Sequence, residues 1–166
     1  MTHEPRADRT VERASAAHRA PAETSLESRM LTALGASLGA ELTPLTLTVD
    51  GVTRLEVEGA DPAGGILVQL VANVGALKSP VRNRVAANMF KLAWLTTSVL
   101  PDSRAILCVT DSVAPAFTAT GWASLAARDL GIEVVRFDDD ERGGRVVAVL
   151  PQPGTIYGSE TSSAES

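Results

Sequence analysis

Two stretches of the chain carry polar residues whose types and spacing suit phosphate binding. Gln69 is the one polar side chain in the apolar run 66–72, whose β-branched residues and flanking glycines are typical of a buried strand. An amide buried without hydrogen-bond partners costs about 1–3 kcal/mol, so Gln69 is expected to point into a polar site. Arg84, Asn88 and Lys91 recur at i, i+4 and i+7 and form a polar stripe if this stretch is helical. A strand with an inward amide, followed by a helix with anion-binding groups, is one way to build a phosphate site.

Charge is unevenly distributed along the chain, whose formal net charge is −5. Residues 65–100 contain four bases and no acid, whereas residues 41–64 contain five acids and one base. The bases are Lys78, Arg82, Arg84 and Lys91, and the acids are Glu41, Asp50, Glu56, Glu58 and Asp61. Because local charge decides what a surface attracts, residues 65–100 predict a surface that contacts DNA or RNA, with Asn88 among the contacting residues. The acids would repel phosphates unless a cation bridged the two.

The residues that bind soft metals are scarce in the part of the chain expected to fold. Both histidines, His3 and His18, lie near the amino terminus, and the single cysteine, Cys108, lies in the apolar run 105–109. Zinc sites and histidine-dependent nucleophilic catalysis are therefore excluded from the rest of the chain. Any bound metal would be a hard, oxygen-liganded ion such as Mg²⁺. A single cysteine forms no disulfide framework, which favours a reducing cytoplasm.

Caps and turns mark the elements that must position these groups. Ser25 is a good N-cap for a helix that ends near Gly39, and Asp50-Gly51 is a strong type I′ hairpin signal. Strands are expected at 45–49, 54–58, 66–72, 105–109, 132–137 and 146–150. The strand at 105–109 follows a helix of crossover length, so we expect it to pair parallel to the strand at 66–72.

Two further helices are expected, from Pro80 to about Leu100 and from Pro115 to Leu130. The first has its core face at Val85, Met89, Leu92, Thr96 and Val99, and the second carries Phe117, Trp122, Leu125 and Ala126. The two tryptophans, Trp94 and Trp122, are interpreted as packing residues, with stacking on bases as the alternative.

Composition predicts one globular domain with disordered ends. The chain has 166 residues, 45% hydrophobic and 21% charged, and no apolar run approaches the roughly 20 residues of a membrane span. Residues 1–24 show neither apolar periodicity nor a secretory pattern, and residues 153–166 belong to a segment rich in Pro, Gly, Ser and Thr. We therefore predict a domain at 25–152 between two disordered tails, without membrane association.

The order of these elements resembles that of the PD-(D/E)xK, or restriction-endonuclease-like, nucleases. The resemblance covers roughly residues 25–150, including the segment KLAWL and the later pattern RAILCVTD…GWASLAARDLGIEVVRF. It implies an α/β fold with one mixed sheet, an α-β-β-β-α-β core followed by α-β-β. In that group an acid at the end of the second strand and a Glu-x-Lys motif on the third strand supply the Mg²⁺ ligands and a lysine. Glu58, or Asp61 in its place, matches the first acid, but Gln69 and Val71 stand where the glutamate and the lysine belong.

Three hypotheses for the function follow. In the first, the site is degenerate and the protein is a nucleic-acid-binding or protein-interaction subunit of a larger assembly. In the second, it is a divergent Mg²⁺-dependent nuclease, with Glu58 and Asp61 as metal ligands, Gln69 as a neutral ligand, and Lys91 or Lys78 as a migrated catalytic lysine. In the third, it is a small α/β protein of unrelated function.

Overall fold

The computed structural model describes residues 9–15 and 25–149, which form seven strands and three α-helices. The strands are β1 (Val11–Ser15), β2 (Thr43–Val49), β3 (Thr53–Ala60), β4 (Ile66–Val71), β5 (Arg104–Thr110), β6 (Ile132–Asp138) and β7 (Arg145–Ala148). The helices are α1 (Leu26–Leu38), α2 (Ser79–Trp94), which continues as a π-helical turn at Leu95–Val99, and α3 (Trp122–Asp129), preceded by a short 3-10 turn at Ala114–Ala116. None of the helices in these ranges has both the length and the apolar composition needed to cross a bilayer.

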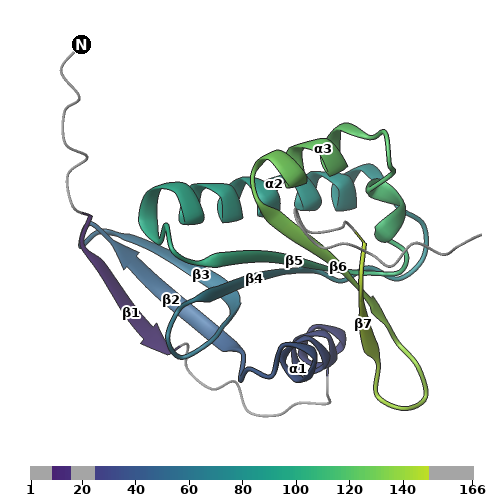
Figure 1. The fold of residues 1–166 in the computed structure, drawn as a ribbon, viewed down its shortest axis with the longest axis horizontal. Coiled ribbons are helices and arrows are strands. Elements are labelled where there is room, and N and C mark those ends of the chain that lie inside the picture. The colour runs from purple at the N-terminus through teal and green to yellow at the C-terminus, as the bar shows by residue number, and fades with distance from the viewer. Residues whose placement is uncertain (1–8, 16–24, 150–166) are drawn as a thin grey trace, which may run out of the picture.

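All seven strands of the described ranges form one sheet, in which spatial order follows chain order from β1 to β7. Neighbours from β1 to β4 pair antiparallel, β4, β5 and β6 pair parallel, and β7 returns antiparallel to β6. Helices α2 and α3 make the crossovers between the parallel strands and cover one face, while α1 covers the other (Figure 1). The predicted α/β class, the mixed sheet and the parallel pairing of β4 with β5 are confirmed.

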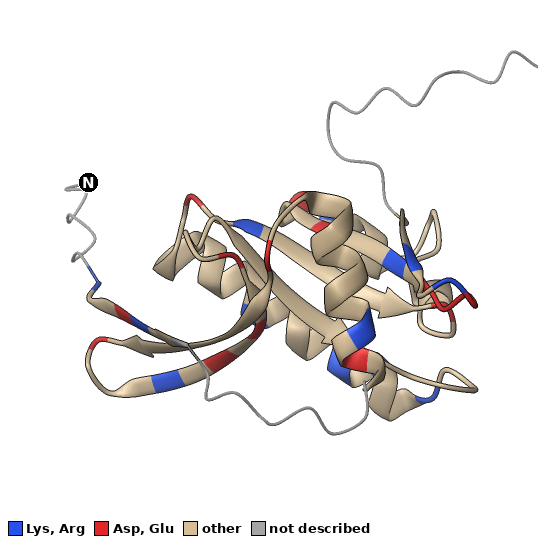
Figure 2. Ribbon diagram, turned by 90° about the horizontal axis from the view of Figure 1, so that it is seen from below, with Lys and Arg blue, Asp and Glu red and all other residues tan. Residues whose placement is uncertain are grey.

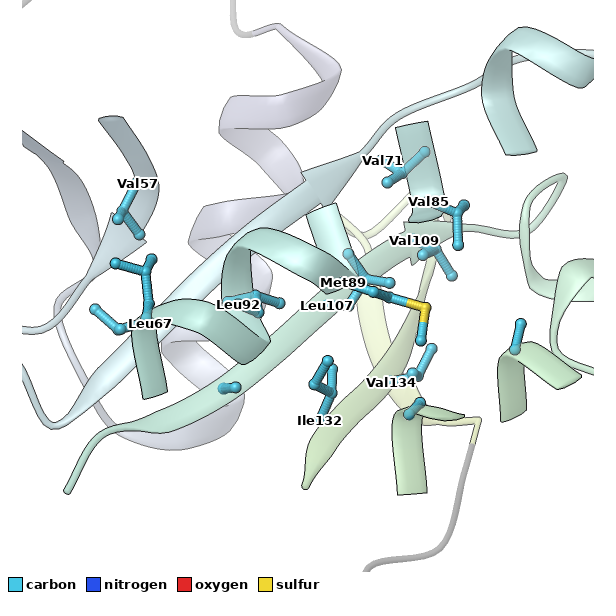
Figure 3. Packing of buried hydrophobic residues seen from close by; sticks show 14 of the residues in the cluster. Val57, Leu67, Val71, Val85, Met89, Leu92, Leu107, Val109, Ile132 and Val134 are labelled. Atoms are coloured by element: carbon cyan, nitrogen blue, oxygen red, sulfur yellow. The ribbon is translucent and has the colours of Figure 1, made fainter. Parts of the chain in front are cut away.

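Two apolar layers, one on each face of the sheet, stabilise this arrangement. The larger joins α2 and α3 to the sheet, and α2 contributes the buried side chains of Val85, Met89 and Leu92, which pack over Leu67 and Val71 of β4 (Figure 3). The smaller, under α1, comprises Met30, Leu34, Val68, Leu70, Ile106, Cys108 and Phe137. Burial raises the pKa of the Cys108 thiol to about 12, as expected for a core cysteine.

The caps and turns expected from the sequence are found where they were predicted. The Ser25 hydroxyl accepts a hydrogen bond from the Ser28 amide at 3.2 Å, and Gly39 ends α1 in the left-handed region at φ 64°. Asp50 and Gly51 both have positive φ, 54° and 72°, as a type I′ turn between β2 and β3 requires. Local signals of this kind therefore fix the boundaries of the first half of the fold.

The prediction of a disordered tail over residues 1–24 is wrong for residues 11–15, which form β1. This edge strand pairs with β2 along its whole length, from Val11 opposite Val49 to Ser15 opposite Leu45. A long-range side-chain contact also holds β1 there: Arg13 donates a hydrogen bond to the Ala63 carbonyl at 2.9 Å. Residues 1–8 and 16–24 lie outside the described residues, as does the predicted tail at 153–166.

The helix predicted from Pro115 to Leu130 is shorter, and its buried face is different. Helix α3 begins at Trp122, after a turn in which the Gly121 amide donates to the Thr118 carbonyl at 3.1 Å. Its buried residues are Ala123, Ser124 and Ala127, whereas Trp122 is 70% exposed and Leu125 is 51% exposed. The small side chains of this short helix are therefore the ones that pack into the core, and its two large apolar residues are exposed to solvent. The interpretation of Trp122 as a packing residue is therefore wrong.

Candidate functional site

The candidate site begins at a β-bulge in β3 that directs Glu58 toward β4. Leu45 pairs with Val57 and Thr43 with Ala60, so one residue of β2, Pro44, lies opposite two residues of β3, Glu58 and Gly59. Val57 and Ala60 both point into the α2 layer, although they are three residues apart. Glu58 lies in this irregular step, and bulges of this kind redirect a side chain away from the normal alternation.

Beyond the bulge the backbone pairing between β3 and β4 stops, and side chains bind the backbone groups of β4 that β3 no longer reaches. Gly59 opposite Val68 and Ala60 opposite Leu67 are the last backbone pairs. The next amide of β4 on the side of β3 is that of Leu70, and it donates to Glu58 Oε2 at 2.6 Å. The Leu70 carbonyl accepts from Asn88 Nδ2 at 3.2 Å. A carboxylate and an amide thus satisfy both polar groups that the missing ladder would leave unpaired.

Lys91 closes the same gap from the helix. Its Nζ donates to the Glu56 carbonyl of β3 at 2.8 Å, one helical turn beyond the Asn88 contact. Glu58, Asn88 and Lys91 are therefore brought together where β3 and β4 diverge under the flank of α2. Arg84 lies on the same flank one turn earlier and is exposed, so the predicted stripe of Arg84, Asn88 and Lys91 is present.

Gln69 lies beside this gap but does not find the partners that the sequence predicted. It is 1% exposed, and alternation places it between Leu67 and Val71, on the face covered by α2. Its Nε2 has no hydrogen-bond partner within the described part of the chain. The side chain is thus a buried donor in an apolar layer. Val71, where the family resemblance implies a lysine, is fully buried in that layer.

Glu58 and Asp61, the predicted metal ligands, are not brought together. Asp61 Oδ1 accepts from the Ile66 amide at 2.7 Å, where it closes the turn between β3 and β4. Ile66 and Leu70 are four residues apart in an extended strand, about 13 Å, which leaves the two bonded oxygens at least about 8 Å apart. Two oxygens bound to one Mg²⁺ lie within about 4 Å of each other. The two hydrogen-bonded oxygens therefore cannot share one Mg²⁺. No group of three or more His, Cys, Asp or Glu side chains suited to a metal occurs among the described residues.

The predicted basic surface has a distinct electrostatic character. Lys78, Arg82 and Arg84 are exposed around the first two turns of α2, and none of them forms an ion pair with a residue in the described ranges. Figure 2, seen from the side of α1, shows both bases and acids on that side of the fold, and Arg29 of α1 pairs with Asp139. The amino-terminal end of α2 therefore presents positive charge that no acid of the described chain neutralises.

A polar cluster that the sequence analysis missed joins the carboxyl ends of β4 and β5. The Asn73 carbonyl accepts from Thr110 Oγ1 at 2.8 Å and from Ser112 Oγ at 2.7 Å, and Asn73 Nδ2 donates to Ser112 Oγ at 3.1 Å. The signal was the presence of these polar residues directly after two apolar strands. Since the groups satisfy one another, the cluster fixes the strand ends.

Neither the comparison with protein-family models nor the comparison with curated proteins gives a match for this chain. The function is therefore inferred from the geometry and charge of the site.

Proposed function

We propose that this protein binds nucleic acid through its phosphate backbone, using the exposed bases of α2, and that it does not cleave it. The proposal includes a restriction-endonuclease-like fold. In its support, residues 25–149 follow the order α-β-β-β-α-β and then α-β-β, and the divergence of β3 and β4 lies beside the residues that the resemblance selects.

One observation carries the proposal: the exposed bases at the amino-terminal end of α2 form no ion pair with any residue that the structure describes. Residues 62–101 include Lys78, Arg82 and Arg84 and contain no acid. Several other arginines of the described fold do form ion pairs, as when Arg104 pairs with Glu133 and Arg136 with Asp138 at 2.7 Å. Arg13, Arg54 and Arg142 do not, but they are scattered over other elements, whereas the bases of α2 are grouped at one end of a helix. When exposed cations bind phosphates, counterions condensed on the nucleic acid are released, and this release is the main driving force of backbone binding.

The absence of cleavage follows from the state of the acidic groups. One oxygen of Glu58 and one of Asp61 each accept a backbone hydrogen bond, at separate points of β4. Gln69 supplies a neutral amide, and Val71 supplies no cation. Losing one strong electrostatic contact typically costs 10²–10³ in rate, so a site lacking two of them is expected to have no activity above background.

The salt dependence of binding tests the proposal. Affinity for duplex DNA, measured by fluorescence anisotropy across a salt series, should fall steeply with salt, and Arg82→Ala and Arg84→Ala should each reduce the log–log slope by about 0.9. Arg29→Ala, on the opposite face, is the matched control and should leave the slope unchanged. Lys91→Ala is less informative, because Lys91 also holds the Glu56 carbonyl.

Two results would overturn the proposal. Absence of binding to DNA and RNA at low salt would leave the protein-interaction role. Cleavage of plasmid, single-stranded DNA or RNA in Mg²⁺ or Mn²⁺, lost in Glu58→Gln, would instead establish the divergent nuclease.

A further inference from the structure

Two aromatic side chains are exposed on the outer surface of the helical layer. Phe90 of α2 is 77% exposed and Trp122 of α3 is 70% exposed, whereas Phe117 and Phe137 are buried. An exposed aromatic residue leaves a large apolar area in water, and a group of such residues on one surface marks an interaction site.

Phe90 and Trp122 are exposed residues of two helices that cover the same face of the sheet. Val85, Met89 and Leu92 of α2 and Ala123 and Ala127 of α3 all pack into one cluster on one face of the sheet. The outward surfaces of the two helices therefore point in the same direction, and the helices lie on the same side of the sheet in Figure 1. The two aromatic residues belong to one outer surface.

This surface is electropositive as well as aromatic. Arg82 precedes Phe90 by eight residues of the same helix, about 2.2 turns, and Arg84 precedes it by six, on the neighbouring flank that carries Asn88 and Lys91. Neither arginine forms an ion pair within the described chain. The one acid of α3, Asp129, is paired with Arg128 at 3.3 Å. Unpaired cations beside exposed aromatic faces are the two elements with which proteins bind single strands: an electrostatic track for the backbone and platforms for the bases.

We infer that the outer surface of α2 and α3 binds single-stranded nucleic acid, with Phe90 and Trp122 stacking on unpaired bases. This inference rests on the proposed function and names the class of ligand. A duplex offers its phosphates but keeps its base faces stacked, so the aromatic residues would gain nothing from it. The other tryptophan of the chain, Trp94, is not equivalent, because the Arg9 guanidinium lies 5.9 Å from its ring centroid.

A second copy of the chain is a less suitable occupant of this surface. In a two-fold dimer the same patch contributes from both subunits, so the cations around the patch would meet the same cations of the partner. Like charges that face each other across an interface cost several kcal/mol. With a polyanion in place of the second copy, the electrostatic contribution of these cations to binding becomes favourable.

Binding of a labelled single strand and of a duplex of equal length, at several salt concentrations, tests the inference. Phe90→Ala and Trp122→Ala should each weaken single-strand binding by about 5- to 150-fold, leave duplex binding unchanged and leave the salt slope unchanged. Trp122→Phe should retain binding, because a phenyl ring still stacks. The parent should show tryptophan quenching on single-strand binding that Trp122→Phe lacks. Val52→Ala, at a residue 82% exposed in the β2–β3 turn, is the control and should change nothing.

The outcomes separate the inference from the proposed function. If the parent binds duplex and single strand equally and Phe90→Ala changes neither, the inference is wrong while phosphate binding stands. If neither ligand binds at low salt, both are wrong. Concentration-dependent self-association that Phe90→Ala abolishes, without any effect on single-strand binding, would assign the patch to a protein contact and overturn the inference.

Discussion

Replacing Gln69 with methionine should stabilise the protein, which is an unusual expectation for a fully buried position. The amide is 1% exposed, its Nε2 has no partner within the described chain, and its neighbours on the same face are Leu67 and Val71. Methionine has nearly the same length and shape but no polar group, so Gln69→Met removes a buried donor and keeps the contacts with α2.

The size of the effect follows from two opposing contributions. An unsatisfied buried polar group costs about 1–3 kcal/mol, all of which the substitution recovers. A volume-conserving exchange in a packed core costs less than about 1.5 kcal/mol. The two contributions leave a difference between about −0.5 and 3 kcal/mol. From the middle of that range we expect the free energy of unfolding to rise by about 1 kcal/mol, which corresponds to an increase in Tm of about 2–4 °C for a domain of this size.

Urea unfolding of Gln69→Met and of the matched variant Asn88→Leu measures this contribution. Asn88 is an amide that does have a partner, the Leu70 carbonyl, so its removal leaves an unpaired acceptor and should cost about 1–3 kcal/mol. The midpoint should rise in the first variant and fall in the second, at an unchanged m-value. If both variants lose stability to the same extent, the Gln69 amide is paired in solution and the reasoning is wrong.

Three further outcomes are expected. A hydrogen bond and charge from Arg136 hold the pKa of Asp138 below its usual value. The stabilisation that ionised Asp138 gives the folded state is therefore complete above about pH 4–5 and is lost as the pH falls through the lowered pKa. In urea titrations from neutral to acidic pH, Asp138→Asn should therefore flatten the acid limb of the stability profile. Because burial raises the pKa of Cys108 to about 12, the thiol should resist a thiol-specific disulfide reagent in the folded protein and react fully in denaturant. Gly144 has φ 87°, and a Cβ there would collide with the ring of Phe137, so Gly144→Ala should lower the unfolding free energy by about 2–4 kcal/mol in urea.

The elements with strong local signals were predicted from the sequence. The N-cap at Ser25, the turn at Asp50-Gly51 and the apolar run of β4 each specify their conformation within a few residues, and the core face of α2 follows from helical periodicity. Parallel pairing of β4 and β5 was predictable because a helix of crossover length separates them.

The features that depend on distant partners were not predicted. The sequence VERAS of β1 has a single β-branched residue, and its strand conformation depends on pairing with β2 and on the reach of Arg13 to Ala63. The exposed position of Trp122 is set by how closely α3 approaches the sheet, which periodicity over eight residues does not determine.

At the candidate site the sequence predicted the residues better than it predicted their roles. Glu58, Asn88 and Lys91 do converge, but they bind backbone groups exposed by the end of the β3–β4 ladder, and a ladder's end has no sequence signature. The separation of Glu58 from Asp61 likewise depends on a bulge whose origin is the register with β2.

The agreement between spatial and chain order in the sheet has a consequence for synthesis on the ribosome. Each strand from β2 to β7 pairs with the strand made just before it, so none of these strands waits for a later segment to emerge. Contacts that close short loops form early and quickly, and domains fold in the direction of synthesis as residues appear. Besides the edge at β1, the growing sheet presents the edge of its newest strand, and the next segment of the same chain covers that edge. A ribosome that pauses after β4 or β5 therefore exposes a buried, apolar parallel strand, and rare codons at those positions should increase aggregation more than rare codons after β3.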